Sequence, residues 1–131
     1  MKLLLDTHIW LWSLLDRKRL SLRVIRELGD PDNELWLSPI SIWELVVLCQ
    51  KGRITLDQEA DAWIAHKLTA VPLREAPVTY EVARETGRLR LPDHDPADRF
   101  LLATAKVFEL TLVTADERIL KSRDVSLLAN R

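Results

Sequence analysis

Glycine and cysteine are scarce in this chain, and long apolar runs are missing. Only 3 of the 131 residues are glycine, which excludes the glycine-rich loop that many nucleotide-binding folds use to hold phosphate. The single cysteine, Cys49, excludes an internal disulfide framework and suits a reducing compartment. Three leucines follow Lys2, but Asp6 interrupts them before the apolar core of a signal peptide forms. Residues 9–15 are far shorter than the roughly 20 residues of a membrane span, so we expect a cytoplasmic protein.

The composition is that of a folded domain with nearly balanced charge. Hydrophobic residues make up 47% and charged residues 30% of the chain, which is typical of a globular protein. We expect residues 1–131 to form a single domain, because this length supports one core but not two. The net charge of −1 gives no overall sign of nucleic-acid binding, although residues 17–19 and the arginines near residue 88 form local basic clusters.

Apolar runs and helix-start signals alternate along the chain. Strands are predicted at residues 2–5, 35–37, 71–73, 110–114 and 125–128. Helices are predicted at 7–15, 21–29, 39–51, 57–69, 78–87 and 96–108, with a loop at 91–95 and a short final helix from Asp116. Ser21 and Asp57 are the expected caps of two of these helices, and Gly52 ends a third. The alternation predicts a mainly parallel sheet that is covered by helices on both faces.

Four acidic residues occupy unusual places in this pattern. Asp6 and Asp116 each follow a buried-type strand, whereas Glu44 and Asp98 lie on helices that should pack against the sheet. The carboxyl ends of neighbouring parallel strands share one edge, which is where open α/β sheets bind ligands. Carboxylates that meet there repel one another unless a cation joins them. The four residues together therefore predict a divalent metal site.

Each acid also has a purely structural interpretation. Asp6 and Asp116 stand where helices begin, so either carboxylate could cap a helix. Asp98 falls in the first turn of a helix that Asp95 is expected to cap, and an acid there favours the helix dipole. Glu44 could instead pair with an arginine. For each residue taken singly, capping or pairing competes with metal binding.

Glu44 is the hardest of the four to explain structurally. Ile40, Trp43 and Val47 follow helical spacing and predict an inward apolar stripe, and Glu44 lies beside Trp43 inside it. A lone ionised glutamate is costly to bury on such a face. The position therefore needs either a charged partner or a metal ion.

Several other polar residues are candidates for contacts at the same site. Thr114, at the end of a predicted strand, could add a hydroxyl, and Arg99 could pair with an acid or a phosphate. His94 lies beside the acidic loop and could touch substrate. The three histidines, however, do not have a metal-ligand spacing. Trp10 and Trp12 cannot both face one core from the same helix, so one is expected at the surface, where it would suit a partner.

Four segments carry a resemblance to a known family. Residues 3–12 (LLLDTHIWLW), 40–45 (ISIWEL), 95–105 (DPADRFLLATA) and 112–119 (LVTADERI) resemble the PIN-domain ribonucleases, and more narrowly the VapC-type toxins of type II toxin–antitoxin pairs. The resemblance implies a three-layer α/β/α sandwich. It also implies an endoribonuclease that depends on Mg²⁺ or Mn²⁺ and is kept inactive by a cognate antitoxin. Asp6, Glu44, Asp98 and Asp116 match the family's acidic site, and Thr114 matches its accessory hydroxyl.

Two positions depart from the pattern of related toxins. Leu48 stands where a lysine often follows the glutamate by one helical turn, and the junction from His94 through Asp95 to the next proline is one residue shorter than usual. Neither departure removes a carboxylate. Both affect the expected contacts with substrate.

The hypothesis that follows is metal-assisted hydrolysis of an RNA phosphodiester. Asp6 and Asp98 would be the main ligands of one or two ions, with Asp116 completing the site. Glu44 would bind through water or help to deprotonate the attacking water. The expected substrate is a structured RNA with an accessible single-stranded loop.

Two other functions compete with this hypothesis. One is a PIN-like module that binds RNA or a partner without cutting. The other is a haloacid-dehalogenase-type phosphatase, but that chemistry needs an aspartate two residues after the first one, and His8 stands there. If the chain is a toxin, an antitoxin helix or tail is expected to insert into a groove, with an arginine near the acids. Helices 7–15 and 21–29 are the expected surfaces for that contact or for homodimerisation.

Overall fold

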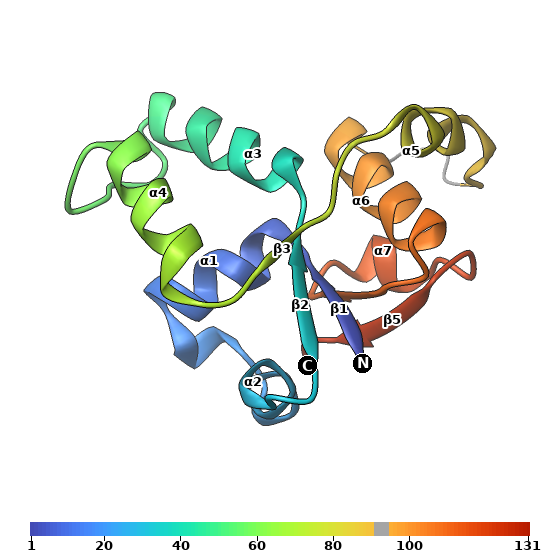
Figure 1. Ribbon diagram of the computed structural model, residues 1–131, viewed down its shortest axis with the longest axis horizontal. Helices are drawn as coiled ribbons and strands as arrows, with labels where there is room; N and C mark the ends of the chain where they lie inside the picture. The colour runs from blue at the N-terminus through green and yellow to red at the C-terminus, as the bar shows by residue number, and fades with distance from the viewer. Residues whose placement is uncertain (91–94) are drawn as a thin grey trace.

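A five-stranded parallel sheet forms the centre of the molecule in the computed structural model, which describes residues 1–90 and 95–131 (Figure 1). The strand order is β3-β2-β1-β4-β5, and every neighbouring pair is parallel. The strands are β1 (Lys2–Leu5), β2 (Glu34–Leu37), β3 (Arg74–Glu75), β4 (Thr111–Thr114) and β5 (Ser126–Ala129). The prediction of a mainly parallel sheet is confirmed.

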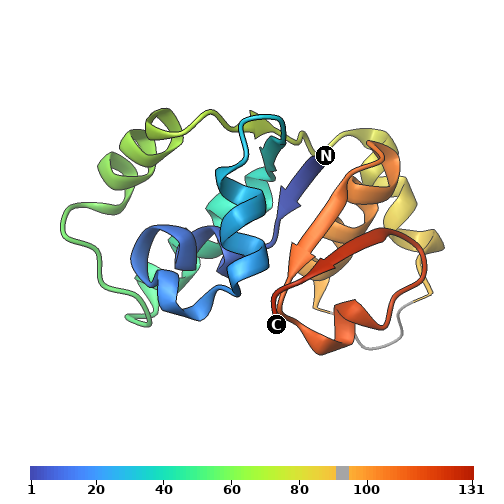
Figure 2. The ribbon, with the colours of Figure 1, turned by 90° about the horizontal axis from the view of Figure 1, so that it is seen from below.

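Helices cover both faces of this sheet. One face carries α1 (Thr7–Leu15), α2 (Leu22–Gly29), α3 (Pro39–Gln50) and α4 (Ala60–Ala70). The other carries α5 (Tyr80–Glu85), α6 (Pro96–Val107) and α7 (Glu117–Leu120), and the view in Figure 2 separates the two groups again. One-turn 3₁₀ helices follow α1 at Arg17–Arg19 and α5 at Thr86–Arg88. The fold is the expected three-layer α/β/α sandwich.

The alternation of side chains along β1 builds two separate cores. Leu3 and Leu5 point into the core on the α1 side, whereas Leu4 points into the core on the α6 side. All three are almost fully buried, as expected for a central parallel strand covered on both faces. Within the described residues, no helix is both long enough and apolar enough to cross a membrane.

The carboxyl edge of the sheet is where three helices begin. The loops are short: α1 starts two residues after β1 ends, α3 two residues after β2, and α7 three residues after β4. The Asp6 amide donates to the Val113 carbonyl (3.0 Å), which ties the end of β1 to β4. Side chains that follow β1 and β4 are therefore brought next to one another.

Most predicted helix boundaries are confirmed to within one residue, but α4 begins three residues later than expected. Ser21 caps α2 by accepting a hydrogen bond from the Val24 amide (3.2 Å). The helix predicted at 57–69 is α4, which starts at Ala60 and is capped by the Glu59 carboxylate, not by Asp57. The reason is that the chain before it packs against the core through alternate side chains, which keeps residues 54–58 out of a helix.

The third strand and the fifth helix also differ from prediction. The strand expected at 71–73 lies instead at Arg74–Glu75, because Pro72 has no N–H to give to a ladder and pairing with β2 begins after it. The helix expected at 78–87 is capped by Thr79 and ends as a 3₁₀ turn after Glu85. β4 and β5 each begin one residue later than predicted, and of the loop at 91–95 only Asp95 lies within the described residues.

The inward face of α3 was predicted incorrectly. Ser41 and Leu45 are fully buried, whereas Trp43, which was placed on the inward stripe, is 58% exposed. The helix is apolar around most of its circumference, so hydrophobic periodicity cannot select the face that packs. Glu44 therefore lies at the border of the packed face and is half-buried.

Candidate active site: an acidic cleft at the carboxyl edge of the sheet

The four predicted acids open onto one cleft. Its volume is about 380 Å³, and its lining comes from α1, α3, α6, α7 and the residues just before three of these helices: Asp6, His8, Trp12, Glu44, Asp95, Asp98, Ala115, Asp116 and Arg118. Residues that are up to 112 positions apart in sequence, Asp6 and Arg118, thus share one surface, because their helices begin at the same edge of the sheet. The convergence expected from the sequence is present.

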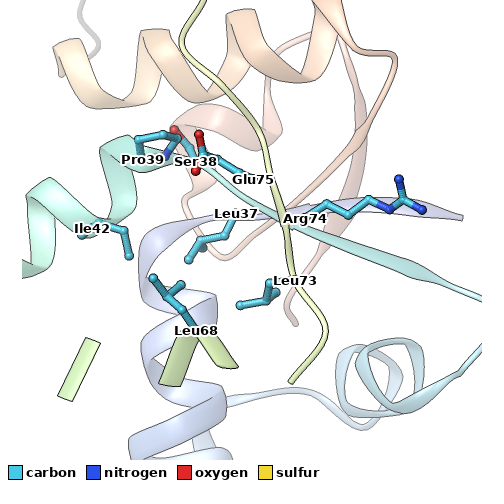
Figure 3. Close-up of a pocket in the computed structure, with 8 residues that line it drawn as sticks. All are labelled: Leu37, Ser38, Pro39, Ile42, Leu68, Leu73, Arg74 and Glu75. Carbon is cyan, nitrogen blue, oxygen red and sulfur yellow. The ribbon is translucent and has the colours of Figure 1, made fainter. Parts of the chain in front are cut away.

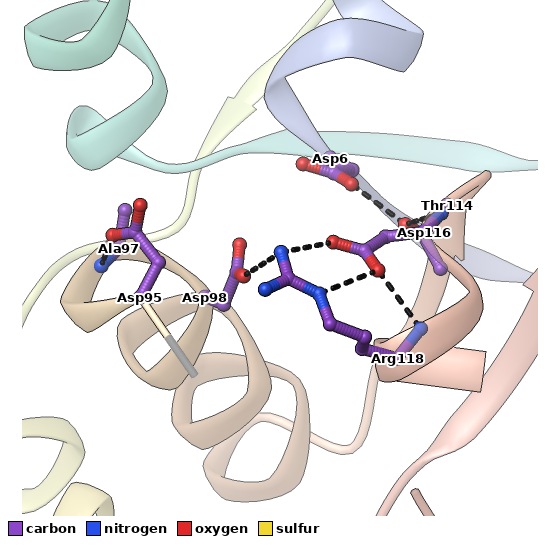
Figure 4. Close-up of polar contacts among 7 residues, drawn as sticks. All are labelled: Asp6, Asp95, Ala97, Asp98, Thr114, Asp116 and Arg118. Carbon is purple, nitrogen blue, oxygen red and sulfur yellow. Dashed lines mark hydrogen bonds and ion pairs between the residues drawn. The ribbon is translucent and has the colours of Figure 1, made fainter. Parts of the chain in front are cut away.

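Asp6 forms the buried base of the cleft. Its side chain does not cap α1; it accepts a hydrogen bond from the fully buried Thr114 hydroxyl (2.6 Å) (Figure 4). The Thr114 oxygen in turn accepts from the Asp116 amide (3.1 Å). Burial raises the pKa of the Asp6 carboxyl, and the Thr114 hydrogen bond opposes part of that rise. Thr114 therefore orients Asp6, and the capping interpretation does not hold for the Asp6 side chain.

Glu44 is held by hydroxyl groups. The Thr7 hydroxyl donates to Glu44 Oε1 and also shares a hydrogen bond with Ser41 Oγ (2.8 Å between the oxygens). Burial, followed by the negative charges of Asp6 and Asp95, raises the pKa of Glu44. In the described part of the chain Glu44 has no ion pair, so the arginine-pairing interpretation is not supported.

Asp98 projects into the cleft from the first turn of α6. Asp95 is the cap of that helix, because its carboxylate accepts from the Ala97 amide (2.9 Å). The Asp98 side chain is only 14% exposed. Burial, and then the charges of Asp6 and Asp116, raise the pKa of Asp98 to about 7. Asp95 therefore caps α6, and Asp98 does not. The Asp98 carboxyl changes its protonation state near neutral pH.

Arg118 lies between two of the acids, as Figure 4 shows. Its Nη2 is 3.2 Å from Asp116 Oδ2 and 3.9 Å from Asp98 Oδ2. Asp116 also caps α7, accepting from the Arg118 amide (2.9 Å). Burial would raise the pKa of Asp116, but these hydrogen bonds outweigh it, so the pKa lies below the ordinary value. The guanidinium partly neutralises the cleft.

The other predicted contacts fall in different places. Thr114 lies under the cleft and Asp95 on its rim. Arg99 donates to the Thr86 carbonyl (3.2 Å), on the side of α6 that faces the 3₁₀ turn after α5. His94 lies outside the described residues. Leu48, the departure from the toxin pattern, lines a neighbouring hollow instead of the acidic cleft.

Four residues of the cleft lining were not predicted as site residues: Ala115 and three residues with larger polar or aromatic side chains. His8 stands two positions after Asp6, Trp12 stands one helical turn further, and Arg118 stands two positions after Asp116. The only feature of the sequence that could have indicated these residues is their short spacing from Asp6 and Asp116. These residues face the cleft because of the way α1 and α7 are rotated about their axes against the sheet. No local sequence pattern predicts that rotation.

The cleft's donor set fits a divalent cation of the Mg²⁺ or Mn²⁺ kind. Carboxylate and hydroxyl oxygens are the ligands that these hard ions prefer. Asp6 has a buried carboxyl group that Thr114 orients, and Asp98 is a carboxyl that burial and then nearby acids make costly to ionise. Among residues 1–90 and 95–131, no group of three or more aspartate, glutamate, histidine or cysteine side chains is close enough together to coordinate a metal ion. Side-chain movement, including that of Arg118, is therefore part of any binding event.

A mostly apolar hollow of about 340 Å³ lies elsewhere, beside the β3 edge (Figure 3). Leu68 and Leu73 line it from one side and Ile42 from another. None of the four predicted acids reaches it. The four predicted acids are thus gathered in the acidic cleft and not in this hollow.

Comparisons of the sequence and of the fold with known proteins all indicate the same family. A model of the PIN domain matches residues 3–124. Ribonuclease VapC22 from Mycobacterium tuberculosis is 33% identical over 123 residues, covering 92% of this chain and 91% of that protein. The fold is similar to VapBC2 from Rickettsia felis bound to promoter DNA (TM-score 0.74, 17% identity, 98% of each chain) and to DNA-bound VapBC from Salmonella typhimurium (TM-score 0.74, 16% identity, 100% and 99%). This chain therefore belongs to the PIN-domain family.

Proposed function

We propose that this protein is an endoribonuclease that depends on a divalent metal ion and acts as the toxin of a toxin–antitoxin pair. The observation that carries the proposal is the meeting of Asp6, Glu44, Asp98 and Asp116 around one cleft at the carboxyl edge of the sheet. Membership of the PIN-domain family and a relative named as a ribonuclease support it. Several structural neighbours are toxin–antitoxin complexes, which supports an antitoxin partner.

In this proposal Asp6, Asp98 and Asp116 hold Mg²⁺ or Mn²⁺. A bound divalent ion lowers the pKa of a coordinated water and stabilises negative charge that develops on the transferring phosphoryl group. Thr114 keeps the Asp6 carboxylate in one orientation through its 2.6 Å hydrogen bond. Ligands that are already oriented lose less freedom when the ion binds.

Glu44 is the candidate acceptor for the proton of the attacking water. Burial and neighbouring acids raise its pKa, which suits a group that must gain a proton during the reaction. The Thr7 hydroxyl orients the Glu44 side chain by donating a hydrogen bond to its carboxylate. The alternative role for Glu44 is to bind the ion through a water molecule.

The proposed toxin works in the cytoplasm on structured RNA, and a cognate antitoxin holds it inactive, in a homodimer or a hetero-oligomer. An antitoxin arginine directed at the acidic cleft would use the pairing that Arg118 already makes with Asp98 and Asp116. The surfaces proposed for that partner are α1 and α2.

The proposal is tested by incubating antitoxin-free protein with total cellular RNA, with and without Mg²⁺ or Mn²⁺. Discrete cuts that require the metal and disappear in Asp98→Asn are expected. Asp61→Asn, an exposed acid on α4 outside the cleft, is the matched control and should cut like the wild type. Intact RNA under all conditions, together with unaltered RNA binding, would favour a non-cutting RNA-binding module instead.

A further inference from the structure

A second hollow of about 430 Å³ adjoins the acidic cleft and shares two of its lining residues, His8 and Trp12. The remaining lining comes from α1, the turn after it, and the segment around the end of α3: Leu11, Leu15, Asp16, Arg19, Leu48, Arg53 and Ile54. The two hollows are therefore neighbours that share one turn of α1. A chain molecule that lies in the acidic cleft reaches the second hollow by passing His8 and Trp12.

Trp12 is a half-buried aromatic ring at the junction of the two hollows. The His8 ring lies 5.8 Å from it at a tilt of 51°, and the Arg19 guanidinium lies 5.4 Å from the ring centre. Leu11 and Leu48 give the hollow an apolar floor. Trp12 is a partly exposed ring with a guanidinium over it and apolar side chains in the same lining, so a nucleobase can stack on the part of the ring that the guanidinium leaves open.

The charges of this hollow complement a polyanion. Arg19 is only partly offset by its 3.3 Å ion pair with Asp16. The Arg53 amide is fixed to the Leu48 carbonyl (2.9 Å), while its side chain has no ion pair among the described residues. The acidic cleft itself repels phosphate unless a cation is bound there, so flanking phosphates need positive groups nearby. Arg19 and Arg53 are placed to supply them.

We propose that this hollow is a subsite for one unpaired nucleotide beside the scissile phosphate of the RNA, with the base on Trp12 and the phosphate near Arg53 and Arg19. The inference rests on the proposed nuclease function and specifies where the strand leaves the acidic cleft. It selects single-stranded RNA, because a paired base cannot leave its stack to meet Trp12. The position beside the acidic cleft and the two arginines favour an RNA strand over an apolar protein segment.

The base contact is tested by fluorescence anisotropy with a labelled ten-nucleotide oligouridylate in Mg²⁺, using an Asp98→Asn background so that the RNA is not cut. Trp12→Leu, which keeps the site apolar, should weaken binding roughly 5- to 150-fold, the range for loss of one stacked base. Tyr80→Leu changes an aromatic residue on α5 that is 92% exposed, and it should leave binding unchanged. Thermal melting of each variant checks that it is folded.

The phosphate contact has an independent readout in salt dependence. Arg53→Ala should reduce the slope of log affinity against log salt by about 0.7, the value for one phosphate contact on a single strand. Arg26→Ala, at an exposed arginine near the end of α2 that lines neither hollow, is the control. Because Arg53 is exposed, this variant remains informative even if Trp12→Leu does not fold.

The outcomes separate the subsite from the nuclease itself. Wild-type affinity in both Trp12→Leu and Arg53→Ala, with cleavage still dependent on Asp98, would overturn the subsite and leave the function standing. No RNA binding and no metal-dependent cleavage by the wild type would overturn both. Unchanged RNA binding combined with lost co-purification of a co-expressed cognate antitoxin would assign the hollow to a protein partner instead.

Discussion

The Asp98 carboxyl makes the stability of the metal-free protein depend on pH. Its pKa is raised from 3.8 to about 7 in the folded state, so ionising it opposes folding. Its stabilising effect is complete below pH 3.8 and is lost as the pH rises through 7. Asp98→Asn should therefore raise the free energy of unfolding at pH 8 by on the order of 1–4 kcal/mol, with little gain at pH 4.

Urea unfolding in the presence of a chelator at the two pH values measures this difference. Asp61→Asn serves as the control, because that carboxylate is exposed on α4. A destabilised Asp98→Asn protein at pH 8, or an equal gain at both pH values, would contradict the proposed electrostatic cost.

Arg118 is a built-in cation that competes with a metal ion for Asp98 and Asp116. Its side chain is 61% exposed, so the contacts are weak, and the gain from removing them is small. Arg118→Ala should tighten Mn²⁺ binding by roughly 1.5- to 5-fold in a calorimetric titration. Arg123→Ala, an exposed arginine outside the cleft, should not change it. Weaker binding in Arg118→Ala would mean that the guanidinium supports the ion instead of competing with it.

At the scale of elements, the end of α3 depends on a backbone conformation that favours glycine. Gly52 has φ +69°, and its amide donates to the Cys49 carbonyl (3.1 Å). A Cβ meets no atom there, so Gly52→Ala suffers only the conformational penalty and should lower stability by about 1 kcal/mol. Gly29→Ala, at the end of α2 with ordinary φ, should be neutral or slightly stabilising by chemical denaturation. Equal effects of the two substitutions would show that φ is not the cause.

Local patterns predicted the central elements well and the peripheral ones less well. Leu3, Leu4 and Leu5 form a continuous apolar run, which is typical of a strand buried on both faces, and β1 is where it was expected. β3 begins three residues later than predicted. Its two residues, Arg74 and Glu75, are both exposed, and pairing with β2 alone sets its position. No apolar alternation marks such an edge strand.

Some residues of the candidate site were likewise predicted from the sequence and others were not. Asp6 and Asp116 were predicted to meet because they follow strands that proved to be neighbours. Thr7, which holds Glu44, and Arg118, which bridges two acids, were not predicted. Their roles depend on the distance between helices that are far apart in sequence, and the spacing of residues along the chain does not contain that distance.

At the scale of the whole molecule, the account predicts toxicity that depends on one carboxylate. Expression of the wild-type chain without its antitoxin should stop growth, because uncontrolled cleavage of RNA removes translation. Co-expression of the cognate antitoxin, or the Asp98→Asn substitution, should restore it, as followed by culture density with protein levels checked by immunoblot. Normal growth with the wild-type protein at full level would contradict the toxin role.

The central claim is that the carboxylates of the acidic cleft hold a divalent ion, and anomalous diffraction from a crystal soaked in MnCl₂ tests it most directly. The account predicts an anomalous peak in the cleft about 2.1 Å from carboxylate oxygens of Asp6 and Asp98, with the Arg118 guanidinium moved aside. A cleft without a peak at millimolar Mn²⁺, with Arg118 still between Asp98 and Asp116, would contradict it.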